Sequence, residues 1–372
     1  MKKRIAVLGA TGSIGKSSLD VISRNMDDFE VVLLSAHSSR RELAELSSLW
    51  PSAVCVLSGE EPSGREKLIQ AIADVRADIT INGISGAAGL EPSLAVIECG
   101  CDLALANKET IVMAGELVFR LAREKNVKII PVDSEHSAIF HLIEAHSNGE
   151  NLIEEIILTA SGGPFRNMSL EQMKSVSPED ALTHPTWKMG PKITIDSASM
   201  ANKGLEIIEA CALFNMPPEK IKAVIHPQSV VHSMVRLCNG VIYAQLSRPD
   251  MRHPIHDALY WPRTTHSGLE TLNFDSLTLE FEKPDLQKFA MLDLAWKAAR
   301  LGGLYPCAYN AANEAAAAAF LRRETGFLDI PRITAHVLEG DWSCGCLCIG
   351  SVLKADADAR LKASSFLKKN MV

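Results

Sequence analysis

Short apolar runs alternate with amphipathic stretches over the first third of the chain. Two of the polar stretches between the runs, residues 17–24 and 40–49, have helical periodicity. This alternation of strands and helices predicts a parallel sheet with right-handed crossover connections. The predicted strands are Arg4–Leu8, Glu30–Ser35, Ala53–Leu57, Ile79–Ile81, Leu103–Ala106 and Lys128–Val132.

The pattern changes twice further along the chain. The middle region is richer in Gly, Pro, Ser and isolated His, and residues 262–288 form a poorly periodic linker. Helical periodicity then predicts a small bundle with helices at 289–301, 311–323, 332–340 and 351–362. We therefore predict an α/β protein with an N-terminal Rossmann-like domain (1–132), a central α+β domain (133–261), the linker (262–288) and a C-terminal α-helical domain (289–372).

Length and composition narrow the class of protein. A chain of 372 residues exceeds one ordinary core, and 47% hydrophobic with 22% charged residues is typical of soluble globular proteins. The net charge of −7 argues against nucleic acid or an anionic membrane as the main partner. No window has the ~18 consecutive apolar residues of a membrane span, and the N-terminus lacks a secretory apolar region. The nine cysteines lack disulfide-framework spacing, so we expect a cytoplasmic protein with reduced thiols.

A glycine-rich loop follows the first predicted strand. Gly9, Gly12 and Gly15 have the spacing G-x-x-G-x-x-G, a variant of the dinucleotide-binding fingerprint. The first glycine allows a tight turn, the second lets backbone amides approach a pyrophosphate, and the third permits close packing of helix on strand. A tight turn without a ligand is the alternative. The position of the loop, at the start of a strand–helix–strand pattern, favours the nucleotide site.

The end of the second predicted strand bears on the choice of cofactor. NAD sites usually have Asp or Glu there to bind the ribose hydroxyls. Here the sequence continues with His37, Ser38, Ser39, Arg40 and Arg41. Hydroxyl groups and two cations thus replace the carboxylate that would repel a 2′-phosphate. The pattern favours NADPH, and the alternative for the arginines is a solvated helix start.

Two acidic residues, Asp133 and Glu135, follow the apolar strand at 128–132. At strand spacing they point to the same side, and two adjacent carboxylates need a cation or a shared proton. Oxygen ligands of this kind suit Mg²⁺ or Mn²⁺. The alternative is an ordinary helix N-cap, because an apolar helix follows. The residues alone leave the two interpretations equally open.

A second polar cluster leads into the predicted helix 205–214. Ser197, Asn202 and Lys203 provide neutral groups and one cation, a set that usually holds a phosphate dianion. If Asn202 is already helical, it shares a face with Glu206, which could supply a third carboxylate to the metal. The alternative is a surface helix with a Lys–Glu pair, the commoner case without other context.

Two loops lie between these clusters. Residues 159–166 follow an apolar strand and offer exposed amides and the Ser161 hydroxyl. Residues 184–192 combine a histidine, an aromatic ring, a glycine and two prolines, and such a segment could close over a substrate as a lid. Plain packing is the alternative for His184 and Trp187.

Together these motifs resemble the 1-deoxy-D-xylulose 5-phosphate reductoisomerase family. The resemblance covers nearly the whole chain and implies NADPH- and metal-dependent conversion of 1-deoxy-D-xylulose 5-phosphate to 2-C-methyl-D-erythritol 4-phosphate, a step of non-mevalonate isoprenoid synthesis. It implies retro-aldol cleavage and recombination, then reduction of the resulting aldehyde. It also implies a homodimer in which the central domain is catalytic and dimerising. The segments in the family's order are GATGSIG (9–15), ANKE (106–109), PVDSEH (131–136), SGGPFR (161–166), HPTWKMG (184–190), DSASMANKGLE (196–206) and MRHPI (251–255).

The resemblance further implies roles for individual residues. Asp133, Glu135 and Glu206 would bind the Mg²⁺ or Mn²⁺, and Lys108 and His184 would complete the catalytic set. The substrate would contact Lys108, Ser134, Glu135, Ser161, His184, Trp187, Ser197, Asn202, Lys203, Glu206 and Met251. NADPH would contact Thr11, Gly12, Ser13, Ile14, Ser38, Asn107, Glu109 and Gly190.

Two features depart from the family pattern. Many members have Gly-Lys-Asn where this chain has His37-Ser38-Ser39, which puts the contact to the 2′-phosphate in doubt. The cysteines at 344, 346 and 348 alternate but lack a fourth ligand for a soft metal, and we interpret them as an incidental cluster.

Two rival functions remain at this stage. A semialdehyde-type dehydrogenase would need an activated cysteine, and the candidates Cys211 and Cys238 lack clear activating neighbours. A non-catalytic NADPH-sensing module would have no use for three carboxylates beside a phosphate site.

Overall fold

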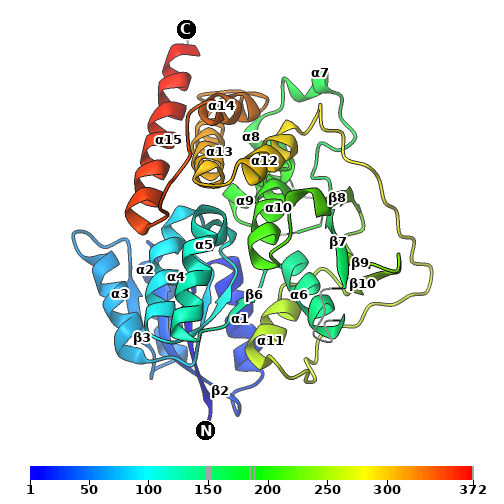
Figure 1. Cartoon of the computed structure of the whole chain (residues 1–372). Helices are drawn as coiled ribbons and strands as arrows, with labels where there is room; N and C mark the ends of the chain where they lie inside the picture. Colours follow the sequence, from blue (N-terminus) through cyan, green and yellow to red (C-terminus); the bar gives the residue numbers. More distant parts are fainter. Residues whose placement is uncertain (147–151, 184–185, 188, 371–372) are drawn as a thin grey trace. The chain divides into compact units, whose positions relative to one another are not determined.

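The computed structural model describes residues 1–146, 152–183, 186–187 and 189–370 (Figure 1). The chain divides into two compact units. The first contains residues 1–110, 118–137 and 250–270, and the second contains residues 111–117, 138–249 and 271–372. Helices α5 (Lys108–Lys125) and α6 (Ser134–His146) have residues in both units. Among the described residues, no helix is long and apolar enough to cross a membrane.

The first unit is built on a parallel sheet with the strand order β3-β2-β1-β4-β5-β6. All six predicted strands are present, and each end differs from the prediction by at most one residue. Ile5, Val7 and Leu8 of the central strand β1 are fully buried, as expected for a sheet covered on both faces. The strands are β1 (Lys3–Leu8), β2 (Phe29–Ala36), β3 (Val54–Leu57), β4 (Ile79–Asn82), β5 (Asp102–Leu105) and β6 (Ile129–Pro131). The helices that connect the first five strands are α1 (Ser13–Ser23), α2 (Arg40–Leu49), α3 (Gly64–Val75), the 3₁₀ turn η1 (Ala87–Gly89) and α4 (Leu90–Glu98).

Helix α11 (Arg252–Tyr260) also packs in the first unit. Its Arg252 Nη1 donates to Asp20 Oδ2 of α1 at 2.9 Å, and the Tyr260 hydroxyl donates to Asp28. The predicted segment 133–261 had grouped this helix with the central region. The observed packing differs because polar groups at both ends of α11 find partners around α1, which sequence order does not reveal.

The second unit contains a mixed sheet with the order β10-β9-β7-β8. β7 runs parallel to β8 and antiparallel to β9, and β10 pairs with β9 at the edge. The strands are β7 (Ile153–Ala160), β8 (Ile221–Ile225), β9 (Val231–Leu237) and β10 (Ile242–Leu246). The helical elements around them are α7 (Leu170–Met173), α8 (Pro178–Ala181), α9 (Pro191–Ala198), α10 (Ala201–Leu213) and the 3₁₀ turn η2 (Pro218–Lys220).

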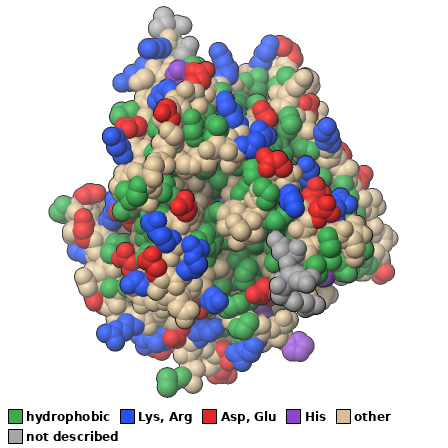
Figure 2. Space-filling model, viewed as in Figure 1, with side chains coloured by type: hydrophobic (Ala, Val, Ile, Leu, Met, Phe, Trp, Pro, Cys, Tyr) green, Lys and Arg blue, Asp and Glu red, His purple; other side chains and the backbone are tan. Residues whose placement is uncertain are grey.

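The predicted C-terminal helices are present in the second unit. Alanine-rich α13 packs against α12, α14 and α15, and its small buried side chains let these helices approach closely. It begins at Tyr305, earlier than predicted, with a proline in its first turn. The bounds are α12 (Ala290–Leu301), α13 (Tyr305–Leu321), α14 (Asp329–Leu338) and α15 (Ile349–Asn370). On the face that Figure 2 shows, Lys and Arg side chains are interspersed with Asp and Glu side chains.

Candidate functional site

The glycine loop joins β1 to α1 in the predicted way. Gly9 has a φ of +78°, and a Cβ added there would lie 2.9 Å from the Gly83 carbonyl oxygen, so only glycine fits. A Cβ added at Gly15 would lie 2.4 Å from the Gly9 oxygen, which shows how tightly α1 packs against the turn. Gly12 is the N-cap of α1 and brings no side chain to its first amides. The loop has the geometry of an anion site at a helix N-terminus, and its predicted cofactor residues are partly or fully exposed: Thr11, Gly12, Ser13 and Ile14.

The segment after β2 carries the candidate groups for a 2′-phosphate. Ser38 is exposed. Arg40 Nη2 donates to Glu60 Oε1 at 2.8 Å, and Arg41 Nε donates to Glu45 Oε1 at 3.1 Å. Both guanidinium groups are therefore exposed but already paired with carboxylates. Binding a 2′-phosphate would require at least one of them to exchange its partner.

Asn107 is the N-cap of α5, and its side chain is engaged within the protein. Its Oδ1 accepts from the Thr110 amide at 3.0 Å and from the Thr110 hydroxyl at 2.6 Å. Its Nδ2 donates to the carbonyl oxygens of Ile84 and Gly86, at 2.7 and 2.9 Å, and lies 2.9 Å from Glu109 Oε2. Asn107 thus ties the start of α5 to the loop after β4. Its predicted contact with the cofactor, and that of Glu109, stay predictions.

Lys108, the first residue of α5, forms a buried ion pair with Asp133. The Lys108 Nζ lies 2.6 Å from Asp133 Oδ2, and the two side chains expose 5% and 11% of their surface. Burial opposes ionisation of Asp133, but the Lys108 charge and the neighbouring His136 outweigh it and hold the pKa of that carboxyl well below its ordinary value. Asp133 is therefore a carboxylate near neutral pH, the form that a metal ligand requires.

Strand spacing does not relate Asp133 to Glu135. β6 ends at Pro131 and α6 begins at Ser134, so Glu135 is helical and the prediction that the two acids share one side of a strand is wrong. The reason is the helix start: Asp133 Oδ1 accepts from the Glu135 amide at 3.3 Å, and the Asp133 carbonyl accepts from the Ser137 amide at 2.8 Å. The N-cap interpretation is thus correct for Asp133. It does not exclude ligation, because a carboxylate has several lone pairs.

The cluster at the start of α10 is helical from Ala201 onward, so Asn202 and Glu206 share a face. Asn202 Nδ2 and Lys203 Nζ donate to the two carboxylate oxygens of Glu206. Lys203 and Glu206 expose only 3% and 1% of their surface, so the alternative of a solvated surface pair is wrong. A carboxylate this deeply buried needs such partners to remain charged.

The two serines predicted for phosphate binding lie on adjoining segments of the second unit. Ser161 follows β7, and Ser197 lies in the last turn of α9. A Cβ added at Gly163 would lie 2.8 Å from the Ser197 carbonyl oxygen, and Gly163 has a φ of +65°, so the loop rests directly on α9. Met200, with a φ of 61°, then turns the chain into α10. The segments that carry Ser161, Ser197, Asn202 and Lys203 therefore adjoin one another, and together they bring hydroxyl, amide and ammonium groups of the kind that bind phosphate.

The predicted lid is described only in part. His184, Pro185 and Lys188 lie outside the described residues. Trp187 is half-buried, with its ring centroid 6.4 Å from that of His232. Gly190 is the N-cap of α9, and Met251 in the first unit is the N-cap of α11.

Cys211, one of the two cysteines considered as a dehydrogenase nucleophile, is not activated. Burial, reinforced by the Glu219 charge, raises the pKa of the Cys211 thiol to about 12, so its thiolate is scarcely populated near neutral pH. Cys238 is exposed after β9. The raised pKa of Cys211 disfavours this residue as the nucleophile of a semialdehyde-type dehydrogenase. The remaining cysteines of interest, all before α15, are Cys344, Cys346 and Cys348.

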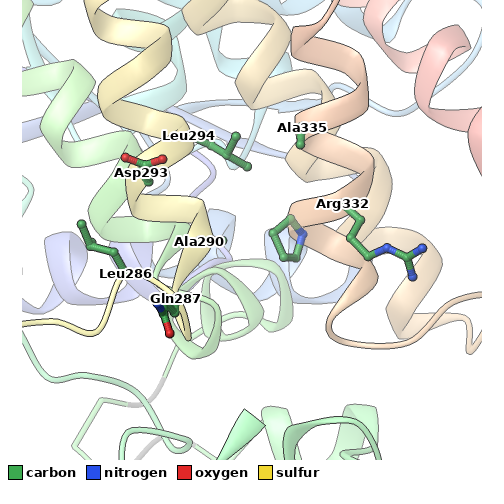
Figure 3. Close-up of a pocket in the computed structure, with 8 residues that line it drawn as sticks. Leu286, Gln287, Ala290, Asp293, Leu294, Arg332 and Ala335 are labelled. Atoms are coloured by element: carbon green, nitrogen blue, oxygen red, sulfur yellow. The ribbon is translucent and has the colours of Figure 1, made fainter.

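A surface pocket of about 490 Å³ lies between the start of α12 and α14 (Figure 3). Leu286 and Leu294 line one side, and Pro331 and Ala335 line the other. None of the predicted site residues that the structure describes borders it, so this pocket is separate from them.

Comparison with known proteins identifies the family. A family model described as 1-deoxy-D-xylulose 5-phosphate reductoisomerase matches residues 5–115, and the model of its C-terminal domain matches residues 129–214. A further model, of the DXP reductoisomerase C-terminal domain, matches residues 246–362. The chain belongs to the 1-deoxy-D-xylulose 5-phosphate reductoisomerase family.

Individual reductoisomerases match over nearly the whole chain. The protein of Treponema denticola is 51% identical over 349 residues, which cover 92% of this chain and 91% of that protein. The protein of Chlorobium chlorochromatii is 46% identical over 382 residues, covering 98% of this chain and 100% of its own. The Zymomonas mobilis reductoisomerase in complex with NADPH has a TM-score of 0.90 at 41% identity, with 99% of each chain covered. A reductoisomerase structure with NADPH, fosmidomycin and magnesium has a TM-score of 0.90 at 37% identity, with 98% of each chain covered.

These matches confirm the predicted family, the fold class and the class of enzyme, an NADPH-dependent oxidoreductase and isomerase. The roles of the single residues in this reductoisomerase stay predictions. Polar residues that contact the candidate phosphate-binding segments were not predicted. Asn313 and Asp196, both buried, are joined by a hydrogen bond of 2.8 Å. The available signal was an asparagine and a glutamate, Asn313 and Glu314, inside an otherwise alanine-rich helix.

Proposed function

We propose that the chain rearranges 1-deoxy-D-xylulose 5-phosphate and reduces the product to 2-C-methyl-D-erythritol 4-phosphate, with NADPH and Mg²⁺ or Mn²⁺. The observation that carries this proposal is the family match over nearly the whole chain, at 46% identity to one relative of full length. Solved structures of the family in complex with NADPH, and with NADPH, fosmidomycin and magnesium, support the choice of cofactors.

The glycine turn would hold the pyrophosphate of NADPH. Thr11, Gly12, Ser13 and Ile14 stand at the N-terminus of α1, where backbone amides favour an anion. Asn107, Glu109 and Gly190 would also contact NADPH, and the Asn107 side chain in addition fixes the loop after β4. Ser38 and one of the following arginines would bind the 2′-phosphate.

Asp133, Glu135 and Glu206 would hold the divalent cation. The donor set fits, because it consists of carboxylate oxygens, which Mg²⁺ and Mn²⁺ prefer. When bound, the cation would polarise the substrate oxygens and NADPH would supply the hydride. Lys108 keeps Asp133 ionised through their contact of 2.6 Å, and with Ser134 it would orient the carbon chain of the substrate.

Ser161, Ser197, Asn202 and Lys203 would bind the substrate phosphate. A phosphate held away from the bonds that change keeps both fragments of a cleaved sugar in place, so that recombination competes with loss. His184, Trp187 and Met251 would cover the carbon chain and keep water out. Of these, Trp187 offers the largest apolar surface.

The test is NADPH oxidation with 1-deoxy-D-xylulose 5-phosphate, by the enzyme treated with EDTA and then supplied with Mg²⁺ or Mn²⁺. Product mass identifies the methylerythritol phosphate. We expect Glu206→Gln to lower kcat by a factor on the order of 10² or more, because the loss of Lewis-acid stabilisation is worth several kcal/mol. Glu339→Gln, on the exposed end of α14, is the matched control and should leave kcat unchanged. Full activity after EDTA treatment would refute the metal assignment.

The cofactor assignment has its own test. We expect NADPH to exceed NADH in kcat/KM, since the segment after β2 has no carboxylate to repel the 2′-phosphate. Arg40→Ala and Arg41→Ala are measured separately. The variant that lacks the arginine bound to the 2′-phosphate should have a smaller ratio of kcat/KM for NADPH to kcat/KM for NADH. A preference of the wild type for NADH would overturn this part of the proposal.

We also propose that the enzyme is a cytoplasmic homodimer without nucleic-acid or membrane partners. The edge of the second sheet supports a dimer. Residues 241–243, at the start of β10, are apolar and 41% to 45% exposed, and edge strands pair readily with another chain. All nine cysteines are free thiols, in keeping with a reducing compartment. The net charge of −7 disfavours a polyanionic partner.

A further inference from the structure

Helix α9 carries Ser197, and the inference that follows rests on the proposed role of Ser197 at the substrate phosphate. With only eight residues, α9 is too short to be stable by itself. Its N-cap, Gly190, provides no side-chain hydrogen bond. The position of α9 must therefore come from contacts with the rest of the second unit.

One of those contacts is polar and involves Asp196, the neighbour of Ser197, which exposes 1% of its surface. The Nδ2 atom of Asn313, on α13, donates to Asp196 Oδ1 at 2.8 Å. The Nζ atom of Lys192, one turn earlier on α9, lies 2.9 Å from Asp196 Oδ2. One carboxylate oxygen thus accepts a hydrogen bond from outside the helix, and the other faces an ion-pair partner within it. Without these partners the buried charge would strongly destabilise this conformation.

Glu314 extends the arrangement to α15. Its Oε1 lies 3.9 Å from Lys192 Nζ, and its Oε2 accepts from Arg360 Nη2 at 2.6 Å. Arg360 Nε also donates to Asp356 at 2.8 Å. Three carboxylates and two cations therefore form one network, and it joins α9 to two helices of the C-terminal bundle. The network residues come from positions far apart in the sequence.

A displacement of α9 would reach each segment predicted to bind phosphate. The loop after Ser161 rests on the Ser197 carbonyl through Gly163. At the other end of α9, Met200 leads directly into the first turn of α10, which carries Asn202 and Lys203. Asn313 itself is fully buried, so it can act on the phosphate only through α9.

We propose that Asn313, Lys192 and Glu314 form a positioning network that acts through Asp196 and fixes α9, and thereby Ser197, for recognition of the substrate phosphate. These are positioning residues, not catalytic ones. The network sets the orientation of the phosphate donors. Of the residues proposed to contact NADPH, Gly190 is the N-cap of α9, and the others lie in the first unit, whereas the network lies in the second.

The test compares Asn313→Ala with Ala316→Gly, a control in the same helix that lowers helix stability without touching the network. Because misplacement of a binding group by about 1 Å can cost a factor of 10², we expect Asn313→Ala to raise KM for the substrate and the inhibition constant of inorganic phosphate by about tenfold. The Kd of NADPH should change by much less, within about threefold, because Gly190 is the one proposed NADPH contact that adjoins α9. Ala316→Gly should lower Tm and leave both phosphate-dependent constants unchanged.

Two further variants keep the test decisive. Lys192→Met removes only the partly exposed cation and should raise the same two constants in the same direction, even if Asn313→Ala folds poorly. Asn313→Asp places two carboxylates face to face, whereas adding Asp196→Asn restores a donor–acceptor pair. The double variant should therefore recover most of the phosphate affinity that Asn313→Asp loses.

Hydrogen exchange of the α9 amides tests the positioning independently of turnover. Exchange across residues 194–200 should be faster in Asn313→Ala than in Ala316→Gly. Equal exchange in these two variants, or an equal rise in the phosphate inhibition constant, would overturn the network proposal. A wild type that turns over the substrate while Ser197→Ala binds phosphate normally would instead refute the role of Ser197. A wild type without turnover would refute the proposed function. The exchange comparison of Asn313→Ala with Ala316→Gly would still decide whether the network fixes α9.

Discussion

At the scale of single residues, glycines decide where two backbones can approach. Gly9 and Gly15 allow the turn and the helix of the nucleotide loop to touch. In the second unit, Gly204 does the same between helices: a Cβ added there would lie 2.4 Å from the Tyr309 hydroxyl and 2.9 Å from the Ala295 Cβ. Gly204 lies beside Lys203, so its packing bears on the candidate site. None of these distances can be read from glycine spacing alone.

We expect Gly204→Ala to destabilise the protein by about 1–3 kcal/mol through overpacking, even though alanine favours a helix more than glycine. Urea denaturation measures the change. Tyr309→Phe removes the hydroxyl that the new methyl group would meet, so the double variant should recover part of the loss. Gly345→Ala is the control, because no atom lies within 4 Å of a Cβ added there. A Gly204→Ala variant as stable as the wild type would show that α10 and α12 can move apart freely.

At the scale of elements, the sequence predicts those helices, strands and turns that depend on the local pattern of residues. The six strands of the first sheet and the glycine turn follow from apolar periodicity and backbone sterics. The predicted relation of Asp133 to Glu135 was wrong because the helix cap, Asp133, stands only two residues after the end of β6, and Asp is tolerated both in a cap and at the end of a strand. The place of α11 was not predictable, since Arg252 and Tyr260 find their partners on a segment more than half the chain away.

The attachment of α11 should depend on pH. Arg252 Nη1 lies 2.9 Å from Asp20 Oδ2, and Arg252 Nη2 lies 2.6 Å from Asp250 Oδ2. Burial opposes ionisation of both acids, but hydrogen bonds from Arg252, joined at Asp20 by those from Arg24, outweigh it and lower the pKa of each carboxyl. A folded-state pKa below the unfolded value of about 3.9 means that the stabilisation is complete above that value and is lost as the pH falls through the folded pKa. Because the groups are partly exposed, it should amount to about 1 kcal/mol or less.

The measurement is urea denaturation of the wild type and Arg252→Met at a series of pH values. The free energies of unfolding of the wild type and Arg252→Met should differ near neutral pH. They should converge as the pH falls below the ordinary aspartate pKa of about 3.9. Arg41→Met is the control, because it removes the Arg41–Glu45 ion pair of α2, in which the arginine side chain is 94% exposed. Its free energy of unfolding should differ little from that of the wild type at any pH. A difference between wild type and Arg252→Met that persists undiminished in acid would contradict the assigned cause.

At the scale of the whole molecule, the candidate site draws on residues that the sequence keeps far apart. The motifs name Asp133, Glu206 and Ser197, because side chains that contact a ligand leave short, specific patterns. The network behind Ser197 leaves no such pattern, since Asp196, Asn313 and Arg360 meet only after three helices have packed. Resemblance to a family therefore identifies the residues that contact ligands more easily than the residues that position them.

The proposed homodimer gives a prediction for the assembled molecule. β10 is the end strand of its sheet, and residues 241–243 expose Val, Ile and Tyr side chains to 45%, 43% and 41%. A charged side chain there should block pairing with a second copy, because edge strands are protected from association in the same way. We expect sedimentation to give a dimer for the wild type and a dimer at least about tenfold weaker for Ile242→Lys, a loss of about 1.4 kcal/mol. Phe274→Lys is the matched control. Phe274 lies in the linker (262–288) and is 67% exposed, and its variant should remain dimeric. A monomeric wild type, or equal weakening by both variants, would exclude β10 as the dimer interface.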